Sequence, residues 1–225
     1  MDEPSWQVLL IGGSSGTGKT TIASQIAKSE QISHLLVDDI RMALQATITA
    51  AQQPDLHYFL TLNDLASLPA ERFIEGFMRV GNALAPALEA IVSHHLAVPS
   101  AGRLIIEGDG ILPTTIATMQ LTGLNGQADL KLREKLRTIF LVEDDENALL
   151  ANFIRRDRGF NQAVNEVQRR YVNSIWHFGQ WISASARQYK QPVVQVRPFE
   201  TLQQRILDSI NQNEEQVIEY NLSIS

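Results

Sequence analysis

The segment Gly13–Thr20, with the sequence GSSGTGKT, combines glycines, one lysine and a hydroxyl residue at fixed spacing. It matches the pattern G-x-x-x-x-G-K-[ST], in which glycines let backbone N–H groups curl around the phosphates of a nucleotide. The lysine reaches the β- and γ-phosphates, and the final hydroxyl suits Mg²⁺. Lys19 is therefore a catalytic candidate and Thr20 a metal ligand. The predicted nucleotide-binding residues are Gly13, Ser14, Ser15, Gly16, Thr17, Gly18, Lys19, Thr20 and Thr21.

The surroundings of this pattern decide how much it means, because eight-residue matches also occur by chance. A short apolar run, Gln7–Ile11, precedes the glycines and is typical of a buried strand. The residues after Lys19 place apolar side chains on one face of a helix, whose N-terminus attracts anions. The sequence therefore predicts a nucleoside triphosphate site. No Asn-Lys-x-Asp motif for guanine follows, so the sequence does not predict a GTPase.

An acid-rich segment, LLVDDIRMAL, ends the second strand candidate at Asp38. In a parallel sheet, an acid at the carboxyl end of a strand faces the ligand crevice. Asp38 is a candidate to orient or deprotonate an acceptor hydroxyl, or to hold Mg²⁺ through water. Arg41, one turn later, could bind an anionic acceptor. The alternative for either acid is a helix cap, and we expect that role for Asp39.

A second acid follows the third strand candidate, in GRLIIEGDGILP. In P-loop NTPases, the residue that holds the metal is a carboxylate at the end of an apolar strand. Glu107 is the predicted metal residue. Asp109 lies in the turn beyond it, and the sequence leaves open whether it supports the metal or only forms the turn.

Arginines gather in NFIRRDRGF and EVQRRY, where a helix–helix turn is expected. A lid that carries arginines over the γ-phosphate would stabilise the transferred charge and exclude water. The alternative is a solvated helix face that pairs with nearby acids. Arg155 and Arg158 are the preferred catalytic candidates among Arg155, Arg156, Arg158, Arg169 and Arg170.

Strand candidates alternate with helical segments along the whole chain, which predicts a parallel sheet covered by helices on both faces. The expected strands are Gln7–Ile11, His34–Val37, Arg103–Ile106, Arg137–Val142 and Pro192–Val196. The longest helix is expected at Ala70–Leu96, with a bend at Pro86. Residues 1–225 read as one domain, with a helical acceptor-binding insertion at about 43–97 and a lid at about 153–172. We expect the acceptor pocket to be roofed by Arg41 and by the helices between Ala43 and Leu96, which carry Arg72 and Arg79.

Composition excludes several classes of protein. The net charge of −6 opposes a nucleic-acid partner, and the absence of cysteine excludes disulfides and thiolate metal sites. No apolar run approaches the roughly 18 residues of a membrane span, and the N-terminus lacks the features of a secretory signal. We expect a soluble cytoplasmic protein with no membrane partner, as a monomer or homodimer.

Taken together, the motifs IGGSSGTGKTTIA, VDDIR and IIEGDGILP, the arginine-rich lid and the last strand resemble the 2-phosphoglycerate kinase-like group of P-loop kinases. More distantly they are similar to gluconate and shikimate kinases and to chloramphenicol phosphotransferase. The resemblance implies a three-layer α/β/α P-loop NTPase fold with a five-stranded parallel sheet of order 2-3-1-4-5 and a helical lid. It also implies transfer of phosphate from ATP to a hydroxyl, with an acid at Asp38 and an arginine at Arg41.

The predicted activity is an ATP-dependent phosphotransfer to a small, hydroxylated and possibly anionic metabolite, similar to 2-phosphoglycerate. The third-strand loop reads EGDGILP, where this group more often has EGVH, so the acceptor stays open. Two alternatives remain at this point: an ATPase switch that regulates a partner, and a toxin-like kinase that acts on a sugar nucleotide or a macromolecule.

Overall fold

A computed structural model describes residues 6–62, 64, 68–156 and 164–211 of the chain. Its strands form a five-stranded sheet in the order β2-β3-β1-β4-β5, and every neighbouring pair is parallel. The predicted α/β class and strand order are confirmed. The strands are β1 (Val8–Gly13), β2 (Ser33–Leu36), β3 (Leu104–Glu107), β4 (Leu136–Val142) and β5 (Val193–Gln195).

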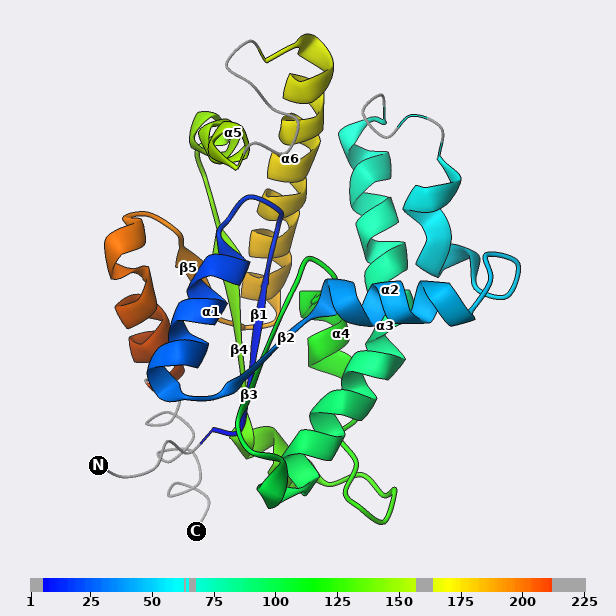
Figure 1. Ribbon diagram of the computed structural model, residues 1–225, viewed down its shortest axis with the longest axis vertical. Coiled ribbons are helices and arrows are strands. Elements are labelled where there is room, and N and C mark those ends of the chain that lie inside the picture. Colours follow the sequence, from blue (N-terminus) through cyan, green and yellow to red (C-terminus); the bar gives the residue numbers. More distant parts are fainter. Residues whose placement is uncertain (1–5, 63, 65–67, 157–163, 212–225) are drawn as a thin grey trace.

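The helices lie between the strands, as the alternation predicts. They are α1 (Lys19–Glu30), α2 (Val37–Thr47), α3 (Ala70–Ala97), α4 (Pro113–Thr118), α5 (Glu146–Arg155) and α6 (Glu166–Gln188). Between α2 and α3 lies a 3-10 helix, η1 (Pro54–Thr61), and a further helix occupies 202–211. The axis of α3 changes direction along its length, as expected from Pro86 inside it (Figure 1). No helix in the described part of the chain has the length and hydropathy needed to cross a membrane.

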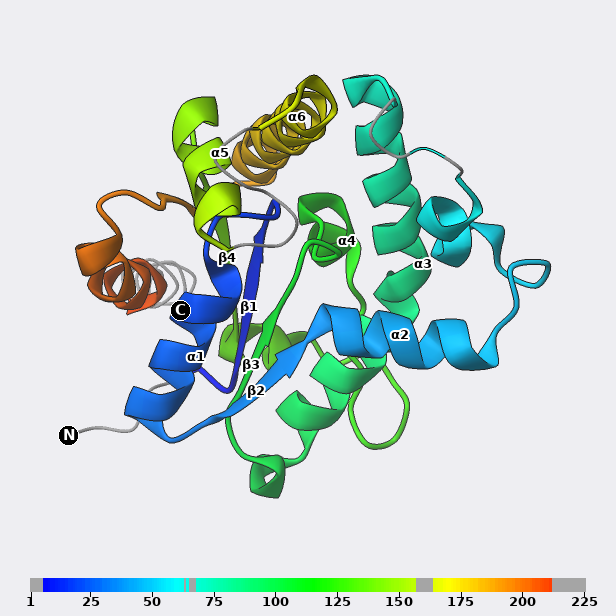
Figure 2. The same ribbon diagram turned by 45° about the horizontal axis from the view of Figure 1, so that its top comes forward.

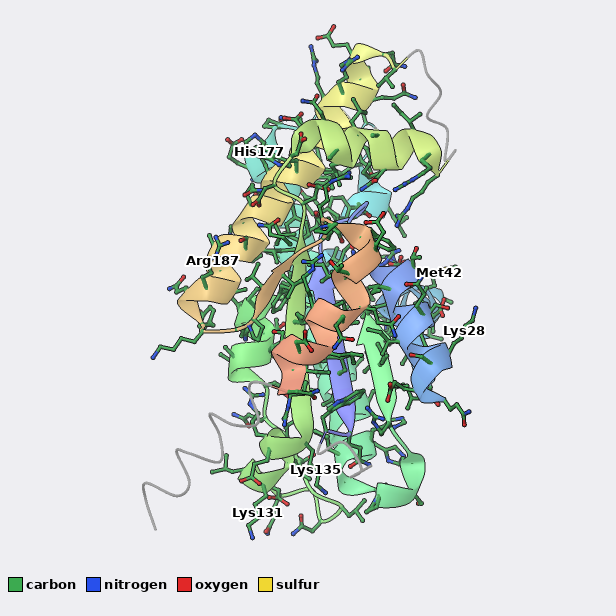
Figure 3. The ribbon with its side chains drawn as sticks, turned by 90° about the vertical axis from the view of Figure 1, so that its left-hand side faces the viewer. Lys28, Met42, Lys131, Lys135, His177 and Arg187 are labelled. Carbon is green, nitrogen blue, oxygen red and sulfur yellow. The ribbon has the colours of Figure 1, made fainter. Side chains whose placement is uncertain are left out.

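The two faces of the sheet carry separate hydrophobic cores, because successive side chains of a strand point to opposite sides. Val8 and Leu10 of β1 pack with α3, α4 and α6 on one face. Leu9 and Ile11 pack with α1 and the helix at 202–211 on the other. Figure 3 shows Lys28 of α1 and Arg187 of α6 pointing away from the sheet on opposite sides of the molecule. The central strand β1 is buried throughout and fixes the position of the glycine-rich loop that follows it.

Most predicted boundaries lie within two residues of the observed ones, but the end of β2 differs in a way that matters. The strand stops at Leu36, and Val37 already begins α2. Asp38 therefore lies in the first helical turn and not at the end of a strand. The segment Thr122–Asp129, between α4 and β4, is largely exposed.

Candidate active site

The loop between β1 and α1 has a backbone that only glycine adopts readily. Gly13, Gly16 and Gly18 have positive φ angles of 138°, 86° and 85°. A Cβ at Gly13 would lie 2.4 Å from the carbonyl oxygen of Leu141, so the loop also passes too close to β4 for any side chain. The α1 helix begins directly after Gly18 without a side-chain cap. These features fit a polyphosphate, which binds to unpaired backbone N–H groups at a helix N-terminus.

The loop lysine is buried and held by two oxygen atoms. Lys19 Nζ donates to the carbonyl oxygen of Ser14 at 2.9 Å and to Oδ1 of Asp109 at 2.5 Å. The other carboxylate oxygen of Asp109 accepts from Ser15 Oγ at 2.8 Å. Asp109 is thus bound to the glycine-rich loop through both oxygens. The sequence left its role open, and the structure places it against the loop lysine.

The two predicted metal residues lie together. Thr20 Oγ1 donates to Glu107 Oε1 at 2.9 Å. Thr20 is exposed, whereas Glu107 is only 3% exposed. Burial raises the pKa of Glu107, and the nearby Lys19 charge opposes this rise. The described residues contain no cluster of three or more His, Cys, Asp or Glu. Such a cluster is not needed for Mg²⁺, which commonly binds one or two carboxylates together with substrate phosphates.

Three cavities adjoin the loop that follows β1. Figure 2 shows α1 on one side of β1 and α2 and α3 on the other. We name these cavities after the ligands or elements predicted for them. The acceptor cavity, of about 240 Å³, lies between α2, η1, α3 and α6. A phosphate cavity of about 350 Å³ contains Lys19, Thr20 and Glu107. A lid cavity of about 700 Å³ lies between the loop, α5 and the segment after β5. The acceptor and phosphate cavities share Ser15, Asp38 and Asp109.

The predicted acceptor residues face the acceptor cavity as a pair. Arg41 Nη2 lies 2.9 Å from Asp38 Oδ1, and both residues line the cavity. The carboxylate of Asp38 is 68% exposed and reaches the phosphate cavity as well. The expected cap at Asp39 is wrong. The α2 helix has Leu36 at its N-cap without a side-chain cap bond, because β2 runs into the helix directly.

The arginines expected in the lid are divided by the structure. Arg155 ends α5, donates to Asn152 Oδ1 at 2.7 Å and lines the lid cavity. Arg156 lines both the lid and the phosphate cavities, so it lies nearer the loop than the sequence suggested. Arg158 lies outside the described residues. Arg169 and Arg170 are exposed on α6, where Arg170 pairs with a glutamate one turn away, as on an ordinary solvated helix.

The expected roof of Arg41 and the insertion helices does line the acceptor cavity, but Arg72 and Arg79 take no part in it. Arg72 pairs with Glu75 at 2.6 Å, and its side chain is 64% exposed. Arg79 pairs with Asp55 at 2.7 Å, and its guanidinium lies over the ring of Tyr58. Neither arginine lines the cavity, because Arg72 is exposed to solvent and Arg79 faces its partners in η1.

Several residues near the loop have no sequence signal of their own. Asn152 Nδ2 of α5 donates to the carbonyl oxygen of Gly16 at 3.0 Å and joins the lid helix to the loop. After β5, Phe199 lies so close to Gly18 that an added Cβ there would be 2.8 Å from its ring. Both residues line the lid cavity, together with Arg197, whose Nε donates to Glu143 Oε2 at 2.7 Å. They follow no motif and meet the loop only through folding.

Comparison with known proteins agrees with this geometry, although no protein-family model matches the chain. A 2-phosphoglycerate kinase from Pyrococcus furiosus is 24% identical over 208 residues, which cover 90% of this chain and 63% of the relative. A gluconokinase structure from Sinorhizobium meliloti 1021 superposes with a TM-score of 0.53 at 14% identity, over 97% of this chain and 99% of its own. The fold is that of the P-loop small-molecule kinases.

A shikimate kinase from Acinetobacter baumannii, solved in complex with shikimate, has the same fold, with a TM-score of 0.51 at 15% identity over 94% of this chain and 99% of its own. At these identities the structural likeness concerns the fold. The chain spans less than two thirds of the length of the curated relative from Pyrococcus furiosus. Activity and substrate must therefore be argued from the residues themselves.

Proposed function

We propose that the protein is an ATP-dependent phosphotransferase that moves the γ-phosphoryl group to a hydroxyl of a small molecule. The observation that carries this proposal is that the phosphate and acceptor cavities adjoin each other. Ser15, Asp38 and Asp109 line both of them. Two substrates bound in these adjoining cavities would present a terminal phosphate and a hydroxyl to each other. Proximity of this kind supplies a large part of the rate of phosphoryl transfer.

The chain's own residues divide the work of transfer. The loop N–H groups and Lys19 bind the phosphates, and Asp38 holds the acceptor hydroxyl and takes its proton. The acceptor oxygen then bonds to the γ-phosphorus as the bond from phosphorus to the β–γ bridging oxygen breaks, leaving ADP. Thr20 and Glu107 would hold Mg²⁺, which supplies neutralisation of phosphate charge when bound. Arg155 and Arg158 are proposed to stabilise the transferred group from the lid side.

The size of the acceptor cavity favours a small metabolite over the alternatives. At about 240 Å³ it lies below the range of roughly 300–1,000 Å³ typical of drug-sized ligands, which disfavours a sugar nucleotide or a macromolecule as acceptor. A regulatory ATPase switch has no need of a second cavity against the phosphates. The name of the curated relatives makes 2-phosphoglycerate the first acceptor to test.

The proposal is tested by acceptor-dependent formation of ADP from Mg²⁺–ATP, measured over a panel of hydroxylated metabolites. Lys19→Ala should lower turnover by about 100- to 1,000-fold, the usual loss when one preorganised charge or donor is removed from a transition state. Lys28→Ala is the matched control, because Lys28 lies exposed on the last turn of the same helix. A folded Lys19→Ala protein with unchanged turnover would contradict the proposal, and ATP hydrolysis that no acceptor accelerates would favour the switch.

A further inference from the structure

Aromatic rings make up part of the lining of the acceptor cavity. Phe59 of η1 lies 5.7 Å from Phe73 and 4.9 Å from Phe77, both of α3, measured between ring centroids. Phe73 and Phe77 are 5.1 Å apart, and Phe77 stacks on the buried Phe178 of α6 at 4.2 Å. Three elements therefore fix these rings by mutual packing, so the apolar wall is formed before any ligand arrives.

Aliphatic side chains also line the cavity. They are Val37, Leu56, Val80 and Leu84. None of these side chains, and none of the phenylalanine rings, donates a hydrogen bond. A phosphate or carboxylate placed against them would lose its water without a replacement, which costs free energy, whereas an apolar group would gain from leaving water.

The charged groups that line the cavity are few. Among the described residues that line it, Arg41 is the only cation, and it is already paired with Asp38. The second carboxylate there is Asp109, which is bound to Lys19. Burial and the nearby Asp109 charge raise the pKa of Tyr171, so its hydroxyl stays neutral. One arginine facing two carboxylates can bind one anionic group, but it offers no second cation for a phosphate and a carboxylate on the same ligand.

We propose that the acceptor is a hydroxyl compound with an apolar, ring-sized body and at most one anionic group. This inference rests on the proposed function and departs from the name of the curated relatives. The hydroxyl lies by Asp38, a single carboxylate of the acceptor pairs with Arg41, and the body packs on Phe59, Phe73 and Phe77. We expect a compound with both a phosphate and a carboxylate, such as 2-phosphoglycerate, to bind less tightly than a ring compound with one anionic group.

Four compounds separate the effect of the ring from the effect of charge. Glycerate has a carboxylate and no ring, 3-phenyllactate has a carboxylate and a ring, 3-phenylpropane-1,2-diol has a ring and no charge, and 2-phosphoglycerate has two anionic groups and no ring. Their dissociation constants are measured by calorimetry on the unaltered protein with a non-hydrolysable Mg²⁺–ATP analogue. Phosphorylated product is measured separately with Mg²⁺–ATP.

We expect 3-phenyllactate to bind at least about tenfold more tightly than glycerate, the smallest gain usual for added apolar groups in a hydrophobic pocket, and 2-phosphoglycerate to bind most weakly. Equal or tighter binding of glycerate or 2-phosphoglycerate overturns the inference. Transfer to 2-phosphoglycerate in preference to the ring compounds also overturns it, while the proposed function stands. Preferential binding of the ring compounds without phosphorylated product supports the ligand class and contradicts the proposed function.

Neighbouring residues of η1 provide matched variants. Phe59 lines the cavity, whereas Tyr58 contacts its ring edge-on and does not line the cavity. Phe59→Leu should weaken 3-phenyllactate and leave glycerate unchanged, and Tyr58→Leu should change neither. Arg41→Gln should weaken 3-phenyllactate but not the uncharged diol. An equal effect of the two η1 variants on all ligands would contradict the assigned position of the ring.

Discussion

Replacing Asp109 by asparagine should make the protein bind metal-free ATP more tightly. The Asp109 carboxylate holds Lys19 at 2.5 Å, and a triphosphate that uses the lysine must take it from this partner. Asparagine has nearly the same shape and keeps an oxygen that can accept from Ser15, but it lacks the charge. The change therefore removes a competitor for the lysine and a repulsive charge beside the phosphates.

The size of the effect follows from the contact. A hydrogen bond to a charged group contributes about 1.5–3 kcal/mol net. The Asp109 side chain is 23% exposed and partly screened by water, so we take the lower end. About 1.5 kcal/mol corresponds to an affinity roughly tenfold higher. With Mg²⁺ present the gain should shrink, because a bound cation near the phosphates is attracted by the carboxylate that the variant lacks.

Calorimetric titration with ATP measures the gain in affinity, first in the presence of a chelator and then in the presence of Mg²⁺. Asp39→Asn is the control, because it removes one charge from an exposed residue of α2 that lines none of the three cavities. If Asp109→Asn binds metal-free ATP no more tightly than this control, the carboxylate does not compete for Lys19 and the reasoning is refuted.

Two further variants test the loop and the metal residues. Gly13→Ala should lower the free energy of unfolding by about 2–5 kcal/mol, from its positive φ and the contact with the Leu141 carbonyl, as measured by urea denaturation; an unchanged stability would contradict the close approach. Because the pKa of Glu107 is raised in the folded state, the native protein without nucleotide should lose stability as pH rises above the ordinary value of 4.5. The Glu107→Gln variant lacks this loss. Its free energy of unfolding should therefore exceed that of the native protein by more at about pH 8 than at about pH 5. Equal advantages at the two pH values would contradict the raised pKa, and the variant should also weaken the dependence of ATP binding on Mg²⁺.

Features that depend on local chemistry could be predicted from the sequence. The glycine spacing predicted the loop because positive φ angles at fixed positions are a property of those residues, and the structure has them at Gly13, Gly16 and Gly18. The buried strands were predictable because a parallel sheet covered on both faces needs continuous apolar runs. Thr20 and Glu107 were each predicted as metal residues from their own motifs, and they lie together because β1 and β3 are neighbouring parallel strands that end at the same edge.

Features that depend on long-range packing could not be predicted. Lys19 and Asp109 are separated by 90 positions, and no pattern in either segment indicates their contact. The periodicity of α3 showed that Phe73 and Phe77 are inward, but not that they line a cavity instead of filling it. The direction of Arg72 and Arg79 also depends on packing, and both pair with acidic residues outside the acceptor cavity.

The residues that line both the acceptor and the phosphate cavities have a thermodynamic consequence. Ser15, Asp38 and Asp109 border both cavities, so filling one changes the field and the hydrogen bonds met by a molecule entering the other. By linkage, the factor by which the triphosphate alters the acceptor's dissociation constant equals the factor by which the acceptor alters that of the triphosphate. Titrations begun from either side must therefore return one coupling constant, whichever substrate enters first.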